Sequence, residues 1–83
     1  MDKLGLYRKK IDSIDKNIVR LLEARFRLAW AIGAHKRKNN LAIKDKKRES
    51  SILTDIKKHS SSPHRKFFEK TFAGIIKYCR KIQ

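Results

Sequence analysis

The sequence predicts an all-α protein whose chain forms three helices, one long and two shorter, and pairs with a second copy as an intertwined homodimer. The 83 residues include only three Gly and one Pro, so few positions favour a break in a helix. Apolar residues recur at steps of three and four, and no segment alternates with the period of two that a strand requires. At this length we expect a single domain over residues 1–83.

The first helix is predicted to begin between Asp2 and Leu4 and to continue to about Lys38. The pair Asn39-Asn40 predicts its end, because Asn adopts the left-handed conformation more readily than most residues. The apolar positions of this helix follow the spacing of one helical face: Ile11, Ile14, Ile18, Leu21, Leu22, Leu28, Ala29 and Ile32.

The length of this first helix predicts a partner chain. A helix of about 34 residues is about 50 Å long. A compact globule of 83 residues has a radius of gyration of only about 12 Å. Two short helices cannot cover such a rod, so much of it must pack against another chain, and an intertwined homodimer is expected.

A second helix is predicted from about Asp45 to Lys58, with Asp45 as its N-cap. Its apolar side is made by Ile52, Leu53 and Ile56.

A polar segment over residues 59–63 predicts the next loop. Ser62 is expected to be the N-cap of a third helix and Pro63 its first residue, since Pro is well tolerated at that position. The apolar residues of this third helix are Phe67, Phe68, Phe72, Ile75, Ile76, Cys79 and Ile82.

Composition limits the classes of function. One cysteine and three scattered histidines predict neither a disulfide nor a metal site, and no cofactor is expected. The first residues lack the apolar run of a signal peptide, and no stretch approaches the ~18 apolar residues of a membrane span, so the cytoplasm is the expected location. The formal net charge of +15 is typical of proteins that bind nucleic acid, a membrane surface or small anions, but it also arises when Lys solvates exposed helical faces.

Two cations lie in line with the apolar face of the first helix. At about 100° per residue, Lys36 falls within about 20° of Arg25, three turns further along. One interpretation is that both side chains bury their stems and extend their charged groups into water. The other is that both point inward with no acid beside them. Because an unpaired buried charge is very costly, such cations predict an anionic ligand, and Arg favours a carboxylate that it can bind through two hydrogen bonds.

The two shorter helices also place polar residues beside apolar ones. Spacing puts Asp45, Arg48 and Glu49 on one side of the second helix, a pattern equally typical of a cap followed by a helical salt bridge. In the third helix, Cys79 and Gln83 continue the apolar face. Cys79 also fits as a small core residue, and Gln83 as a frayed end.

Arg8 lies about 100° around the first helix from Arg25, near a second apolar strip formed by Val19, Phe26 and Trp30. If this strip faces a partner chain, Arg8 points across the interface. Otherwise it is an ordinary surface arginine.

A longer pattern extends over both of the first two helices. It reads RKKIDSIDKNIVRLLEARFRLAWAIGAHK from Arg8 to Lys36 and IKDKKRESSIL from Ile43 to Leu53. This pattern resembles the all-helical, AroQ-type chorismate mutases from Tyr7 to about Ile56, and the third helix matches more loosely. The resemblance implies a dimer of three-helix chains with shared sites. It also implies an isomerase that converts chorismate to prephenate by a Claisen rearrangement, on the route to phenylalanine and tyrosine.

The resemblance also implies which residues bind the carboxylates of this dianionic substrate. Arg25 and Arg8 of the partner subunit are implied as the clamps, with Arg48 supporting the carboxylate end. Cys79 stands where the family often has Ser, and a thiol is a weaker donor to a carboxylate than a hydroxyl is. Ala42 departs from a frequent Pro in the loop between the helices.

The remaining implied roles concern the reacting bond and the ring. Lys36 and Gln83 are implied to donate to the ether oxygen that loses its bond to carbon. Glu49, with the backbone near Asp45, is implied to hold the ring hydroxyl. Because the reaction is unimolecular, it needs no general base, and conformational trapping with electrostatic stabilisation is the expected means of catalysis.

Two other functions stay open. An isochorismate-pyruvate lyase shares this fold and has a related set of cations, although the D-x-x-R-E segment over residues 45–49 looks more like the mutase. A basic helical nucleic-acid-binding protein would concentrate its cations on one solvent face and expose aromatic residues for stacking. Because Arg25 and Lys36 lie in line with apolar residues, we expect no nucleic-acid or membrane partner, only the substrate and a second copy.

Overall fold

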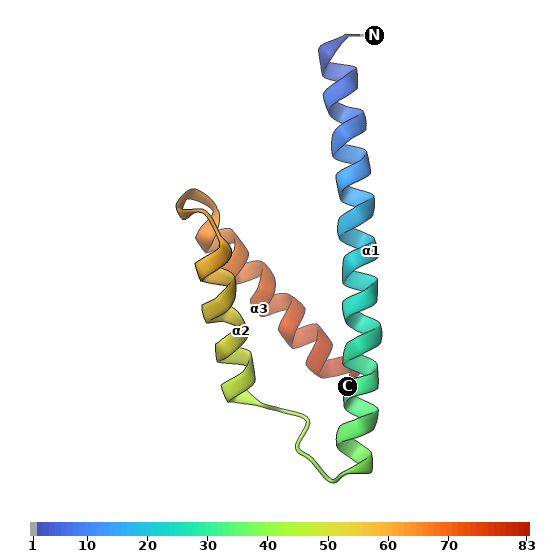
Figure 1. Cartoon of the computed structure of the whole chain (residues 1–83), viewed down its shortest axis with the longest axis vertical. Helices are drawn as coiled ribbons and strands as arrows, with labels where there is room; N and C mark the ends of the chain where they lie inside the picture. Colours follow the sequence, from blue (N-terminus) through green and yellow to red (C-terminus); the bar gives the residue numbers. More distant parts are fainter. Residues whose placement is uncertain (1) are drawn as a thin grey trace.

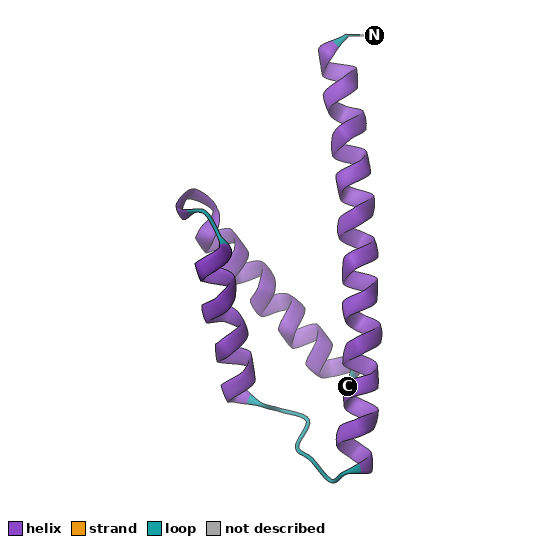
Figure 2. Cartoon of the chain, viewed as in Figure 1, coloured by secondary structure: helices purple, strands orange, loops and turns teal. Residues whose placement is uncertain are grey.

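The computed structural model describes residues 2–83, and in these the chain is built from helices and their connections. The order is α1 (Lys3–Lys38), α2 (Lys46–His59), a 3-10 turn η1 (Ser62–His64) and α3 (Arg65–Ile82). Figure 1 shows α1 as a long rod, with α2 and α3 forming a hairpin beside its C-terminal half. Figure 2 shows helices joined by loops, and no strand occurs between residues 2 and 83. The predicted all-α class and the one long and two shorter helices are confirmed.

The ends of α1 follow from local hydrogen bonding. At its start, the Asp2 side chain accepts a hydrogen bond from the Gly5 N–H at 2.6 Å, which satisfies one of the free donors of the first turn. At its end, Asn39 is the C-cap and Asn40 adopts φ 55°, the left-handed conformation predicted for this pair. The last turn carries four basic residues, which suit the negative end of the helix dipole: His35, Lys36, Arg37 and Lys38.

The start of α2 agrees with its prediction. The Asp45 side chain accepts a hydrogen bond from the Arg48 N–H at 3.0 Å and so caps the helix. Glu49 lies in the first turn, where a negative charge is favourable.

The entry into α3 differs from its prediction. Ser62 is not an N-cap but the first residue of the 3-10 turn, for which Ser61 is the N-cap, and α3 itself begins at Arg65. Pro63 lacks an N–H and has a φ that suits the first turn of either helix type. The sequence signal for a start was therefore correct, but it could not distinguish a 3-10 turn from the first turn of an α-helix.

Helix α3 is the element that holds the chain together. It packs against both α1 and α2, whereas the backbones of α1 and α2 stay apart within residues 2–83. Where α3 crosses α1, small residues allow close packing, and the buried residues are Ala29 and Gly33 from α1 with Ile76 and Cys79 from α3. Beside this crossing the rings of Phe26 and Tyr78 meet edge to face, with centroids 4.9 Å apart.

The single chain is far from compact. Its radius of gyration is 16.4 Å and its extents are 57 × 26 × 15 Å. Its accessible surface is 7175 Å², whereas a compact monomer of this mass exposes about 5,200 Å². Of the apolar face predicted for the first helix, Ala29 is buried and Leu22 half-buried, and the others are exposed. Large apolar residues are exposed along α1 from Leu4 to Ile32, and its N-terminal end projects past the hairpin (Figure 1).

None of the helices in the part of the chain that the structure describes is both long enough and apolar enough to cross a bilayer.

The crossing of α3 over α1 can be tested at its tightest point. A Cβ added to Gly33 would lie 2.6 Å from the Cα and 2.8 Å from the carbonyl carbon of Gln83, closer than atoms can approach. We expect Gly33→Ala to lower the free energy of unfolding by about 1–3 kcal/mol, through overpacking. Urea denaturation of both proteins at the same chain concentration measures this difference in the free energy of unfolding.

Gly74 supplies the control within the same fold. It also lies in a helix, and an added Cβ would meet nothing within 4 Å. Gly74→Ala should therefore stabilise the protein by about 0.5–1 kcal/mol, as expected for an open helical position. Equal stabilisation by both substitutions would mean that the Gly33 crossing is looser than described.

Candidate functional site

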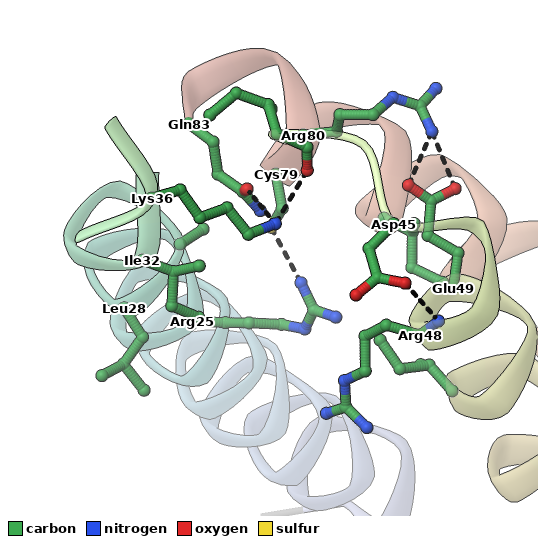
Figure 3. Close-up of a pocket in the computed structure, with 14 residues that line it drawn as sticks. Arg25, Leu28, Ile32, Lys36, Asp45, Arg48, Glu49, Cys79, Arg80 and Gln83 are labelled. Atoms are coloured by element: carbon green, nitrogen blue, oxygen red, sulfur yellow. Dashed lines mark hydrogen bonds and ion pairs between the residues drawn. The ribbon is translucent and has the colours of Figure 1, made fainter. Parts of the chain in front are cut away.

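The three helices line an open cavity of about 420 Å³ beside the crossing of α1 and α3. Figure 3 shows how its walls are divided, with Arg25 and Lys36 from α1 on one side, Arg48 and Glu49 from α2 opposite, and the end of α3 between them. The sequence-predicted residues that line it are Arg25, Lys36, Asp45, Arg48, Glu49, Cys79 and Gln83.

Apolar side chains form the rest of the cavity wall. They come from all three helices and consist of Leu28, Ala29, Ile32, Ile52 and Ile76, with Ile43 from the loop before α2. An apolar wall interrupted by a few convergent polar groups is typical of a small-molecule site.

Arg25 enters the cavity one turn before Ala29, where α3 packs on α1. Its Nη1 donates to Sγ of Cys79 at 2.8 Å, and the side chain is half-buried. No acidic side chain pairs with Arg25 among residues 2–83. A thiol is a weak acceptor, so a carboxylate entering the cavity would be the better partner for this guanidinium.

Lys36 and Gln83 form a pair of hydrogen-bonding groups at one end of the cavity. Lys36 Nζ donates to the Ile43 carbonyl at 2.7 Å and to Gln83 Oε1 at 3.1 Å. An ammonium group has three N–H donors and accepts none, so one N–H of Lys36 remains available. The same contact orients the Gln83 amide, because its oxygen must face Lys36 and its NH₂ group is then left free to donate.

The backbone of Gln83 is also held in place. The Arg37 guanidinium donates to the Gln83 carbonyl, and the absence of a side chain at Gly33 lets this backbone lie against α1. Gln83 is half-buried rather than frayed. The structure therefore gives it a definite position next to Lys36.

The acidic residues of the cavity are both already engaged. Asp45 caps α2 through its contact with the Arg48 N–H. Both carboxylate oxygens of Glu49 accept from Nη1 of Arg80, each at 2.7 Å, and this ion pair is largely shielded, with side chains 25% and 30% exposed. By contrast, the Arg48 guanidinium has no ion-pair partner within residues 2–83.

Arg80 is the cavity residue that the sequence did not single out. It follows Cys79 directly, about 100° around α3 from the face that the apolar spacing marks. Its pairing with Glu49 depends on how α2 and α3 lie against each other, which no local sequence signal specifies. The only sequence signal for its place in the cavity was that it directly follows Cys79, a predicted site residue.

Arg8 does not belong to the cavity of its own chain. It is exposed on the projecting half of α1, about 25 Å along the helix from Arg25. Within one chain it cannot reach the cavity, and its place in the cavity of the partner subunit stays a prediction.

The chemistry that this arrangement supports is anion binding with directed hydrogen bonds. Four cations and two carboxylates line the cavity, which gives it a formal charge of +2: Arg25, Lys36, Arg48 and Arg80 against Asp45 and Glu49. In the range 2–83, no three His, Cys, Asp or Glu side chains come together as a set of metal ligands. A small organic anion suits such a cavity.

Comparisons with known proteins identify relatives of this chain. Residues 7–83 match the family model described as chorismate mutase type II. Among curated proteins, the chain is 46% identical over 56 residues to the bifunctional chorismate mutase/prephenate dehydratase of Aquifex aeolicus, a match that covers 68% of this chain and 16% of that protein. A protein of the same name from Buchnera aphidicola is 42% identical over 55 residues, or 66% of this chain and 14% of the relative. The chain therefore spans only about a sixth of the length of these relatives.

A solved structure extends the similarity over nearly the whole chain. A conserved hypothetical protein from Pyrococcus furiosus superposes with a TM-score of 0.75 and 36% identity, over 99% of this chain and 96% of that one. The match of the family model over residues 7–83 shows that the chain belongs to the chorismate mutase type II family.

Proposed function

We propose that this chain is a chorismate mutase, which converts chorismate to prephenate in a cavity shared between two copies. The observation that carries the proposal is that Arg25, Lys36 and Arg48 converge on one apolar-walled cavity without an acid paired to any of them. Membership of the chorismate mutase type II family supports the substrate. No cofactor or metal takes part.

The substrate is a dianion, and two of these cations bind its carboxylates. Arg25 exchanges its weak thiol acceptor, Cys79, for one carboxylate, and Arg48 supports the carboxylate end from the opposite wall. Arg8 of the partner subunit completes the clamp. Holding both carboxylates fixes the compact conformer in which the reacting atoms meet, so binding supplies the orientation that the reaction needs.

The reaction breaks one carbon–oxygen bond and forms one carbon–carbon bond within the same molecule, with no proton transferred. Negative charge develops on the ether oxygen as its bond to carbon lengthens. The free N–H of Lys36 and the NH₂ group of Gln83 donate to this oxygen. Because Ile43 and Arg37 already hold these two residues in place, little reorganisation is needed when the charge appears.

The ring end of the substrate carries a hydroxyl. Glu49 accepts a hydrogen bond from it, beside the backbone near Asp45. Each carboxylate oxygen of Glu49 has one contact to Arg80 and retains a further lone pair for this purpose.

The second copy covers the projecting half of α1. The accessible surface of the single chain exceeds that of a compact monomer by about 2,000 Å². This excess is comparable to the area that obligate dimers bury. Exposed apolar residues lie along this half of α1 and would form the interface: Leu4, Leu6, Tyr7, Ile11, Ile14, Ile18 and Val19.

The activity is tested by supplying chorismate and isochorismate separately. We expect prephenate from chorismate, because Lys36 and Gln83 can donate to its ether oxygen and the rearrangement needs no proton transfer. Absorbance at the chorismate band and product chromatography measure it. Pyruvate from isochorismate with no prephenate from chorismate would identify a lyase on this fold instead.

Replacing Lys36 tests the electrostatic part of the mechanism. Lys36→Ala removes a donor to the developing charge and should lower kcat by about 10²–10³-fold. The far-ultraviolet circular dichroism should stay helical. Lys38→Ala removes an equal charge from an exposed position of the same helix and should leave kcat unchanged. An equal fall in kcat for both variants would mean that Lys36 acts only through the net charge of the protein and not as a hydrogen-bond donor to the ether oxygen.

Mixing two inactive variants tests the shared site. Arg8→Ala and Arg25→Ala should each be nearly inactive alone. After co-refolding at equal amounts, random pairing gives half heterodimers with one intact cavity of two, so activity should recover to about a quarter of the wild-type value. Light scattering should give twice the chain mass. No recovery beyond the sum of the two variants would mean that Arg8 and Arg25 do not complete one cavity from different chains.

A further inference from the structure

The ion pair between Arg80 and Glu49 carries an inference beyond the roles proposed above. Arg80 lines the cavity, but its guanidinium forms an ion pair with Glu49. Arg25 and Arg48, in contrast, have no acidic partner among residues 2–83. Arg25 and Arg48 can therefore pair with an incoming anion, whereas Arg80 is already paired with Glu49.

The geometry of the pair leaves Glu49 able to act. A single nitrogen, Nη1 of Arg80, contacts both carboxylate oxygens at 2.7 Å. Each oxygen has two lone pairs, so both remain able to accept one more hydrogen bond. Arg80 therefore restrains the carboxylate without blocking it.

The charge of the pair matters as much as its geometry. An uncompensated carboxylate at Glu49 would face a ligand that carries two negative charges in the same cavity, and like charges at such short range repel. With Arg80 present the pair is neutral, and the cavity keeps its formal charge of +2. Without it the cavity charge would fall to +1 while the carboxylate remained.

We propose that Arg80 is a positioning residue: it holds Glu49 at the cavity wall as a neutralised hydrogen-bond acceptor, so that one site can bind a dianion and a hydroxyl on the same molecule. This proposal rests on the function proposed above. It assigns no direct contact between Arg80 and the substrate, and the effect of Arg80 passes entirely through Glu49.

The competing explanation is that the pair only ties α2 to α3. The two residues do come from these two helices. A tie would stabilise the fold and would affect kinetics only as far as the fold is weakened. The proposal instead predicts that Arg80 affects substrate binding, and only while Glu49 carries a charge.

The test is a double-mutant cycle on KM, kcat and the urea midpoint, with Arg80→Gln, Glu49→Gln and the two combined. Repulsion by an uncovered carboxylate acts on the substrate and the transition state alike, so it should appear in KM. We expect Arg80→Gln to raise KM for chorismate about ten-fold, with kcat changed less than about three-fold. In the Glu49→Gln background the same substitution should change KM by less than about two-fold.

Two further variants sharpen the cycle. Arg80→Lys should keep KM within about three-fold of wild type, because one nitrogen makes both contacts and a single ammonium can replace it. It also keeps the test open if Arg80→Gln folds poorly. Lys81→Gln removes the same charge from the next, exposed position of α3 and should leave KM and kcat unchanged, which controls for long-range steering.

Three results of this cycle would contradict the proposed role of Arg80. A ten-fold rise in KM in both backgrounds would mean that Arg80 binds the substrate itself, and would overturn the proposal. A KM that changes only in step with the urea midpoint would identify a structural tie and would also overturn it. Wild-type protein that forms no prephenate would reject the proposed function and this proposal together, whereas active wild type with an unchanged Arg80→Gln variant would reject this proposal alone.

Discussion

The close crossing of α3 over α1 at Ala29 and Gly33 is the contact on which the site depends. It is the place where the two helices share buried residues, and it brings the last turn of α3 against the face of α1 that carries Arg25 and Lys36. Ala and Gly allow this approach because larger side chains would hold the helices apart. The cavity exists because α2 packs on α3 and its backbone stays at a distance from that of α1 within residues 2–83.

The polar network follows from the same crossing. Gln83 reaches Lys36 because its backbone lies against Gly33, and Arg37, one helical turn after Gly33, holds the Gln83 carbonyl. Positions three and four apart on a helix lie on one face, so the space for Gln83 and the groups that hold it are encoded within a single turn of α1. A site assembled in this way is already organised before a ligand binds, which is the condition for electrostatic catalysis.

The sequence predicted what depends on a single helix. The bounds of α1, the cap at Asp45 and the common face of Arg25 and Lys36 follow from spacing and capping alone, and all are confirmed. It failed where a result depends on how helices lie against one another, as with the pairing of Arg80 and Glu49. It also failed at Ser62, where Pro63 fits a 3-10 turn and an α-helix equally well. The family pattern added Gln83 as a donor, which spacing alone could equally assign to a frayed end.

The small number of buried residues has a consequence for how the fold and the site are linked. Hydrophobic burial is the main favourable term in folding, and among residues 2–83 of one chain the buried apolar side chains are those at the crossing, Ala29, Ile76 and Cys79. The apolar residues on the projecting half of α1 contribute to stability only when something covers them. If a second copy does so, the segment that stabilises the fold also carries Arg8 into the neighbouring cavity, since both lie on one rigid helix. Assembly and completion of the site would then be one event, and a chain without its partner would lack both a full core and a full clamp.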